Sequence, residues 1–169
     1  MTDLPTAETP VAPTLGLRHA VLWVSDPGRS ADFYREALGL EVTNQLGSAV
    51  FMSSPASATD HDLALFKSDE AAPESAHAIG LYHLAWEVAT IEQLMAAKDR
   101  LVSVGAYVGE NNHGMSRSIY AQDPDGIEFE IMWEVPVDLL LDDEPANQPL
   151  DFGADIARFG SNAAGRGAR

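Results

Sequence analysis

The stretch LRHAVLWV at residues 17–24 is repeated as LYHLAWEV at residues 81–88, and this internal repeat indicates the fold. His19 in the first copy falls on His83 in the second, an offset of 64 residues. Both copies are apolar runs of the length typical of strands. Similarity at a fixed offset within one chain is a property of a repeated fold rather than of composition, so the sequence predicts two structural repeats.

The same order of further elements follows each copy. Amphipathic helices are predicted at 28–38, ended by Gly39, and at 91–104, ended by Gly105. Three strands then follow in each half, predicted at 41–46, 49–53 and 61–67 in the first and at 107–110, 116–122 and 127–134 in the second. The predicted fold class is therefore α+β, with two βαβββ repeats forming a curved mixed sheet.

The repeats make up one predicted domain over residues 16–136, divided into 16–67 and 80–136. Residues 1–15 are rich in Pro, Thr and Ala and are expected to form an extended or disordered arm. The connector at 68–79 is polar and rich in Ala. Residues 137–169 form an acidic tail, expected to pack through 139–141 and then to fray.

Composition excludes several classes of function. The chain has 169 residues and no cysteine, so disulfides, thiolate metal sites and cysteine nucleophiles are excluded. Its 26 acidic and 10 basic residues give a formal charge of -16, which argues against binding to nucleic acid phosphates. No apolar run approaches membrane-spanning length, and the N-terminus does not resemble a secretory signal. We therefore expect a soluble cytoplasmic protein without a membrane partner.

The stretch NNHGMSRSIYAQDPDGIEFE at residues 111–130 carries the densest group of chemically useful side chains. Alternation along the strands places His19, His83 and Glu130 on the faces that do not pack against the predicted helices. If those faces line one concave surface, the three side chains can converge. Two imidazoles and a carboxylate suit a redox-active divalent metal with open coordination positions. His113 and Tyr120 are then candidates for acid–base work beside the metal.

These residues together resemble the vicinal oxygen chelate superfamily, and within it the type I extradiol ring-cleavage dioxygenases such as catechol 2,3-dioxygenases. The signature of that class runs from a His through an aliphatic–Tyr pair to an acidic-Pro-x-Gly turn and a Glu. The corresponding residues are His113, Ile119, Tyr120, Asp123-Pro124-Asp125-Gly126 and Glu130. In that class two or three residues separate the Gly from the Glu. Only Glu130 fits, because a single residue separates Glu128 from Gly126. The resemblance covers 17–135.

The resemblance implies a function and a set of roles. His19, His83 and Glu130 would bind Fe(II), with Mn(II) as the alternative metal. A catecholic substrate and O2 would occupy the open positions, and the ring would be cleaved next to the diol. His61 would move a proton, while His113 and Tyr120 would hydrogen-bond the catecholic oxygen. A homodimer or higher homo-oligomer is expected.

Two other classes stay open on the sequence. A glyoxalase or epimerase of the same superfamily would add a carboxylate ligand from the first half, where only Asp62 is available, on the opposite face from His61. A metal-free resistance-type binding protein would lack the ligand triad. His77 is read as a surface residue, and Glu87 and Glu128 as solvated or pocket-wall carboxylates. The sequence has no clear Arg pair for a substrate carboxylate, which favours neutral catechols or biaryl diols.

Overall fold

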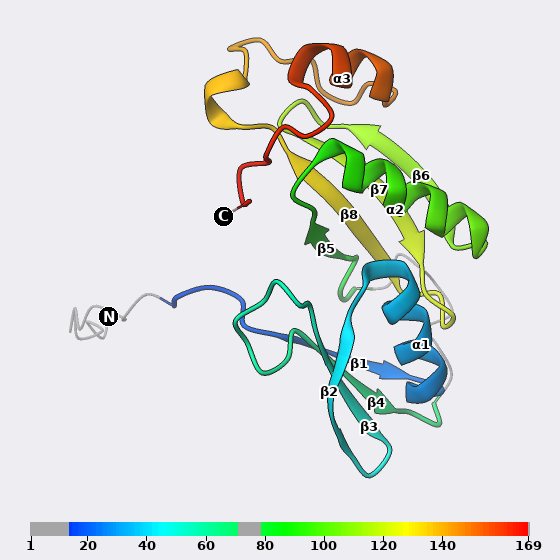
Figure 1. Cartoon of the computed structure of the whole chain (residues 1–169). Coiled ribbons are helices and arrows are strands. Elements are labelled where there is room, and N and C mark those ends of the chain that lie inside the picture. The colour runs from blue at the N-terminus through cyan, green and yellow to red at the C-terminus, as the bar shows by residue number, and fades with distance from the viewer. Residues whose placement is uncertain (1–13, 71–78, 169) are drawn as a thin grey trace, which may run out of the picture.

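The computed structural model describes residues 14–70 and 79–168 and contains two modules of the same topology (Figure 1). The elements of the first module are β1 (Ala20–Val24), α1 (Pro27–Leu38), β2 (Glu41–Leu46), β3 (Ala49–Ser53) and β4 (Leu63–Lys67). Those of the second are β5 (Leu84–Glu87), α2 (Ile91–Ser103), β6 (Tyr107–Asn112), β7 (Ser116–Gln122) and β8 (Glu128–Glu134). The two predicted βαβββ repeats are confirmed.

Each module forms its own four-stranded mixed sheet. The strand order is β1-β4-β3-β2 in the first and β5-β8-β7-β6 in the second. In both, the first strand pairs in parallel with the last, and the other pairs are antiparallel. The strands β1 and β5 are thus edge strands of separate sheets.

The histidines expected to open strands lie just outside them. In the first module Ala20 pairs with Leu63, and in the second Leu84 pairs with Phe129. Because these parallel registers begin there, His19 and His83 immediately precede their strands, and His61 lies two residues before β4. A side chain at such a position is held by its neighbours rather than by a hydrogen-bonded ladder.

Local signals explain where the helices begin and end. The side chain of Asp26 accepts hydrogen bonds from the backbone of Gly28 and Arg29 at the start of α1. Gly39 ends that helix in the left-handed conformation, with φ of 69°. Thr90 caps α2 by accepting a hydrogen bond from the Gln93 amide.

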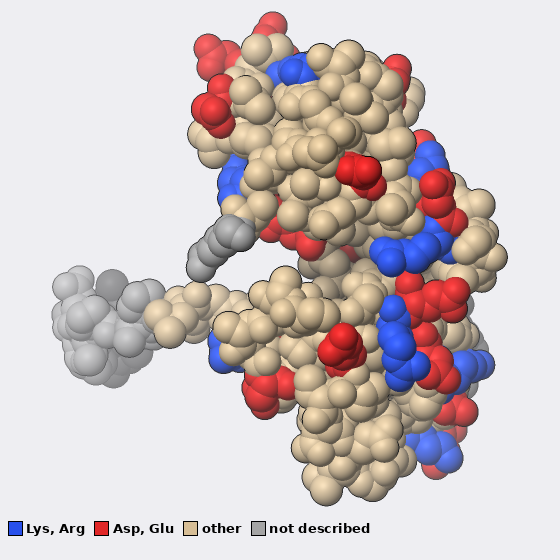
Figure 2. All heavy atoms as spheres, in the orientation of Figure 1, with Lys and Arg blue, Asp and Glu red and all other residues tan. Residues whose placement is uncertain are grey.

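One hydrophobic core joins the two modules. The helix-facing sides of both sheets are buried, as alternation predicts, and α1 also packs against α2. Between the modules, the ring centroid of Phe129 lies 5.9 Å from that of Phe33 and 5.8 Å from that of Tyr34. Figure 2 shows the charged side chains gathered mainly on the side that carries α1 and α2 in Figure 1.

The C-terminal segment folds back onto the second module, and here the expectation was wrong. After a short helical turn, η1 (Val137–Leu139), the chain continues to α3 (Phe152–Phe159), which contacts α2. Phe159 packs on Trp133, with ring centroids 5.4 Å apart. The segment does not fray after 141, because its polar and aromatic side chains find partners on β7 and β8.

Three expectations concern parts that the structure leaves undescribed, in whole or in part. The N-terminal arm was predicted over 1–15, and residues 1–13 of it lie outside the described residues, as does 71–78 of the connector with His77. Among the helices that are described, none is long and apolar enough to cross a membrane.

Candidate functional site

Four of the predicted site residues lie together in the second module. Glu130 on β8 is the direct antiparallel partner of Tyr120 on β7, and β8 pairs on its other side with β5, which His83 precedes. His83 Nε2 lies 3.0 Å from Glu130 Oε2. The rings of His83 and Tyr120 are 5.8 Å apart, and the Tyr120 hydroxyl is 2.7 Å from His113 Nε2. We call this set the second-module group.

Burial sets the chemistry of the second-module group. Glu130 is only 7% exposed, so its carboxylate is largely removed from water beside an imidazole. His83 Nδ1 is buried with no hydrogen-bond partner in the described part of the chain. Burial, followed by the charge of Glu130, raises the pKa of Tyr120. The phenol therefore keeps its proton at neutral pH and can donate a hydrogen bond.

The other two predicted residues form a first-module group. The rings of His19 and His61 are 4.5 Å apart and tilted by 35°. His61 Nδ1 lies 2.9 Å from Asp60 Oδ2, and this hydrogen bond lowers the pKa of the Asp60 carboxyl. Phe51 meets the His61 ring edge-on at 5.2 Å. His61 thus has one nitrogen occupied by a carboxylate and a ring held between neighbours.

The expected convergence of all three metal ligands is not seen. No set of three His, Asp or Glu side chains among residues 14–70 and 79–168 is placed to hold one metal ion. His19 instead lines a cavity of about 180 Å³ that Leu84, Ala85 and Trp86 of β5 also line. Figure 2 shows a hollow between the two modules. The separation follows from the architecture, because β1 and β5 belong to different sheets.

Asp62 also lines that cavity, but its carboxylate is already used. It accepts hydrogen bonds from Ser53 Oγ, the Ser54 amide, Ser57 Oγ and Thr59 Oγ1, at 2.7 to 2.9 Å. Burial acts to raise the pKa of this carboxyl, but these donors outweigh it and the net pKa is lowered. Asp62 organises the loop between β3 and β4.

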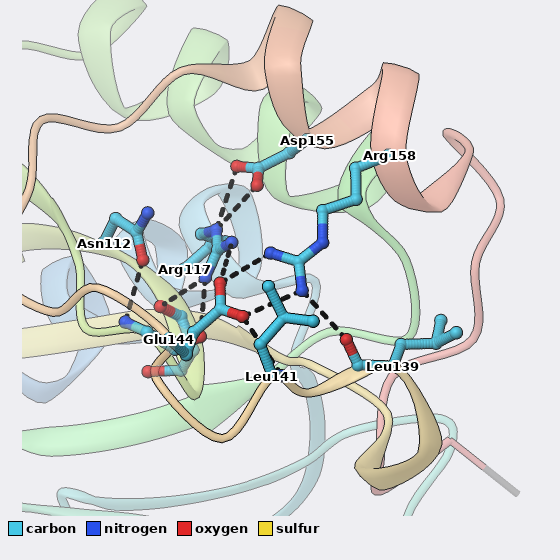
Figure 3. Close-up of polar contacts among 9 residues, drawn as sticks. Asn112, Arg117, Leu139, Leu141, Glu144, Asp155 and Arg158 are labelled. Atoms are coloured by element: carbon cyan, nitrogen blue, oxygen red, sulfur yellow. Dashed lines mark hydrogen bonds and ion pairs between the residues drawn. The ribbon is translucent and has the colours of Figure 1, made fainter.

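An ion-pair network around Arg117 of β7 and Arg158 of α3 attaches the C-terminal segment to the second module (Figure 3). Arg117 is 2% exposed; its Nε contacts both Asp155 oxygens at 2.8 and 3.0 Å, and its Nη1 donates to the Gly114 carbonyl. Arg158 pairs with Glu144, and the Arg158 guanidinium donates to the Leu139 carbonyl. The sequence did not reveal this network, because its acidic members lie in a segment whose composition suggested solvent exposure.

Comparison with known families identifies relatives of this chain. A family model described as the Glyoxalase/Bleomycin resistance protein/Dioxygenase superfamily matches residues 16–131. Among curated proteins, Metapyrocatechase 2 from Cupriavidus necator is 30% identical over 115 residues, which are 65% of this chain and 33% of that protein. The chain therefore spans about a third of the length of the curated relative it matches.

Solved structures share the fold. A glyoxylase/bleomycin resistance protein/dioxygenase domain from Frankia sp. EAN1pec matches with a TM-score of 0.63 and 22% identity, over 72% of this chain and 99% of that one. Lactoylglutathione lyase from Agrobacterium tumefaciens matches at 0.55 and 22%, over 72% and 95%. The fosfomycin resistance protein FosX from Listeria monocytogenes matches at 0.55 and 21% in two crystal forms, over 70 to 71% of this chain and 91 to 93% of that one. The predicted fold class is confirmed by these matches.

Proposed function

Because the chain belongs to the glyoxalase/bleomycin resistance protein/dioxygenase superfamily, we propose that it is an extradiol dioxygenase that opens the ring of a catecholic substrate with O2 at a non-haem Fe(II) centre. The observation that carries this proposal is the second-module group, in which a buried carboxylate meets an imidazole beside a Tyr–His pair. The similarity to a metapyrocatechase, a catechol 2,3-dioxygenase, supports a dioxygenase over other members of the superfamily.

The residues present suit a divalent metal. Metal ligands of these types lie about 2.1 Å from the ion, so two that share it must lie within about 4 Å of each other. His83 Nε2 and Glu130 Oε2 meet that condition, at 3.0 Å. Imidazole and carboxylate are the ligand types of non-haem Fe(II) oxygenases, and Mn(II) accepts the same donors. His83 and Glu130 would therefore hold the metal, with His19 as the third ligand.

His19 has to reach the second-module group for the site to be complete. It can do so by closure of the gap between β1 and β5, or from a second copy in the expected homodimer. Val21 and Trp23, on the same face of β1 as His19, are 51% and 68% exposed. An apolar strand face of this kind next to an incomplete site favours a second copy as the source.

The roles of the remaining residues follow from their contacts. Bound iron would supply the electron transfer between the catecholate and dioxygen. Tyr120, protonated and aligned with His113, would donate a hydrogen bond to the catecholic oxygen where negative charge develops. Asp60 contacts Nδ1 of His61 and leaves Nε2 to take a proton from the substrate and return it.

The rival members of the superfamily make different demands. A glyoxalase or epimerase with four protein ligands needs a carboxylate from the first half, and Asp62 is saturated by four donors. A metal-free binding protein would not require His19, His83 and Glu130 as a ligand set. The metal bound by the purified protein separates the classes: iron favours the dioxygenase, zinc or nickel an isomerase, and no metal a binding protein.

The direct test is anaerobic reconstitution with Fe(II), followed by a panel of catechols read for oxygen uptake and a yellow ring-opened product. Glu130→Gln should lose both iron and turnover. Glu128→Gln is the matched control, because Glu128 lies on the same face of the same strand and is only partly buried. Glu128→Gln should keep both properties. Full iron binding and activity in Glu130→Gln would refute the proposed site.

A further inference from the structure

We propose that Asp125, in the turn Asp123–Gly126 before β8, is a positioning residue that sets the orientation of the two modules. The turn belongs to the signature stretch at residues 111–130, and no metal-ligand or acid–base role was assigned to it there. Its consequence for iron binding rests on the proposed function, but its effect on module orientation does not.

Both oxygens of Asp125 are bound by the first module. Oδ2 accepts a hydrogen bond from the Ser25 amide at 2.9 Å, and Oδ1 accepts one from the Ser25 hydroxyl at 2.6 Å. Oδ1 also accepts one from Arg29 Nη2 at 2.6 Å. Arg29 Nη2 in turn donates to Ser25 Oγ at 2.9 Å, so the three side chains are mutually connected. We call Ser25, Arg29 and Asp125 the inter-module clamp.

The turn itself does not require the Asp125 side chain. Its shape comes from Asp123, whose Oδ1 accepts hydrogen bonds from the Asp125 and Ile127 amides, and from Gly126, with φ of 80°. The carboxylate of Asp125 is only 17% exposed, although a turn residue without a further role would be free to face water. The Asp125 carboxylate therefore contributes to the contact between the modules rather than to the shape of the turn.

A second hydrogen bond beside the inter-module clamp also restrains the angle between the two modules. Asp123 Oδ2 accepts a buried hydrogen bond from the Tyr34 hydroxyl at 3.1 Å, again from the first module. The aromatic contacts of Phe33 and Tyr34 with Phe129 lie next to it. The apolar contacts hold the modules together, while directional hydrogen bonds fix the angle at which they meet.

Geometry makes that angle important for the proposed metal site. The clamp holds the end of β1 and the start of β8, whereas His19 lies at the other end of β1. At about 3.3 Å per residue, His19 is about 20 Å along the strand from Ser25. A rotation of about 10° at the clamp would then move His19 by about 3.5 Å relative to the second module, and so displace it from the site that it completes in the same chain or in a second copy, whereas metal–ligand distances tolerate about 0.2 Å.

The test uses the absence of cysteine from the chain. Cysteines introduced at exposed Ser48 in the first module and Ala96 on α2 carry nitroxide labels, and double electron–electron resonance gives the distance distribution between modules. Asp125→Ala should shift or broaden this distribution by about 3 Å, the displacement estimated above. A label pair within the first module, at Ser48 and Glu36, should not change. The control Asp32→Ala removes an exposed carboxylate that pairs with Arg35 along α1.

Partial rescue separates positioning from general destabilisation. Asp125→Asn keeps an acceptor oxygen for Ser25 and loses the charge that binds Arg29, so it should give a distribution between those of the parent and Asp125→Ala. An inter-module distribution in Asp125→Ala identical to that of Asp32→Ala would overturn the proposal, whatever the protein binds. Affinity for Fe(II) is measured on the same variants and should fall at least tenfold in Asp125→Ala. Altered distances in a protein that binds no iron would uphold the clamp and refute the proposed function.

Discussion

The buried Arg117 makes the attachment of the C-terminal segment measurable. Asp155→Ala removes the carboxylate that both receives Arg117 Nε and carries α3 onto β7. Arg117 is 2% exposed, so the guanidinium cannot turn to water without local unfolding. Removing one partner of a buried ion pair costs about 3 to 5 kcal/mol. Glu144, 3.6 Å from Arg117 Nη2, remains as a weaker partner, so we expect the lower end, about 3 kcal/mol.

Urea unfolding followed by Trp fluorescence is the suitable assay, because Trp133 packs on Phe159 of α3. With a slope of about 2 kcal/mol per molar, the midpoint of Asp155→Ala should fall by about 1.5 M. Asp142→Ala, which removes an exposed carboxylate from the same segment, should stay within about 0.5 kcal/mol of the parent. The pair Arg117→Met with Asp155→Leu should recover much of the loss, since no buried charge is left unpaired. Equal midpoints for Asp155→Ala and Asp142→Ala would refute a stabilising role for this network.

Four further predictions concern the two modules and the site. Burial would raise the pKa of the Asp125 carboxyl, but its donors in the first module outweigh burial, so the pKa is lowered overall. The ionised carboxylate should therefore stabilise the fold above about pH 4 and lose this effect below it. As a result, the urea midpoints of the parent and Asp125→Asn should converge as the pH falls from 7 to 3. Tyr120→Phe should keep iron and slow ring cleavage on the order of a hundredfold, and an unchanged rate would remove its role. His19→Ala and His83→Ala should each lack iron. If a second copy supplies His19, refolding the two variants together should restore about a quarter of the metal sites. If each site is built within one chain, refolding them together should restore none. His61→Ala should change the pH dependence of turnover between pH 5 and 9, and an unchanged profile would assign proton transfer to another residue.

Periodicity was sufficient to predict the modules because each depends on local patterns. The strands β2, β3 and β7 have the predicted bounds, and both helices begin within one residue of the prediction. Alternation also assigned the faces correctly: Leu22 and Val24 are buried in the core, while Val21 and Trp23 are exposed. The same reasoning placed Glu130 on the opposite face of β8 from Phe129 and Ile131, and the structure adds Tyr120 as its direct partner there. These outcomes follow from pattern because a strand has only two faces.

The placement of one module against the other could not be predicted in this way. Parity states which face carries His19 but not how far that face lies from Glu130. That distance depends on contacts such as Ser25 with Asp125, which join residues 100 positions apart and have no periodic pattern. The C-terminal segment was misjudged for a related reason. Asp155 is one acidic residue among many in the sequence, and its role depends on a buried Arg117 in a strand 38 positions earlier.

The signature stretch therefore serves two physical tasks that composition alone does not separate. Tyr120 and Glu130 face the open side of the sheet and can act on a ligand, whereas Asp123 and Asp125 are bound by groups of the first module. A carboxylate that accepts three short hydrogen bonds from another module is not available for chemistry, but it restricts the motion of everything attached to that turn. Glu130 lies five residues beyond Asp125, so the metal-binding carboxylate that we propose is anchored through the same turn that orients the modules. Substitutions in this turn should consequently alter metal affinity without touching a ligand, in proportion to their effect on the distance between the modules.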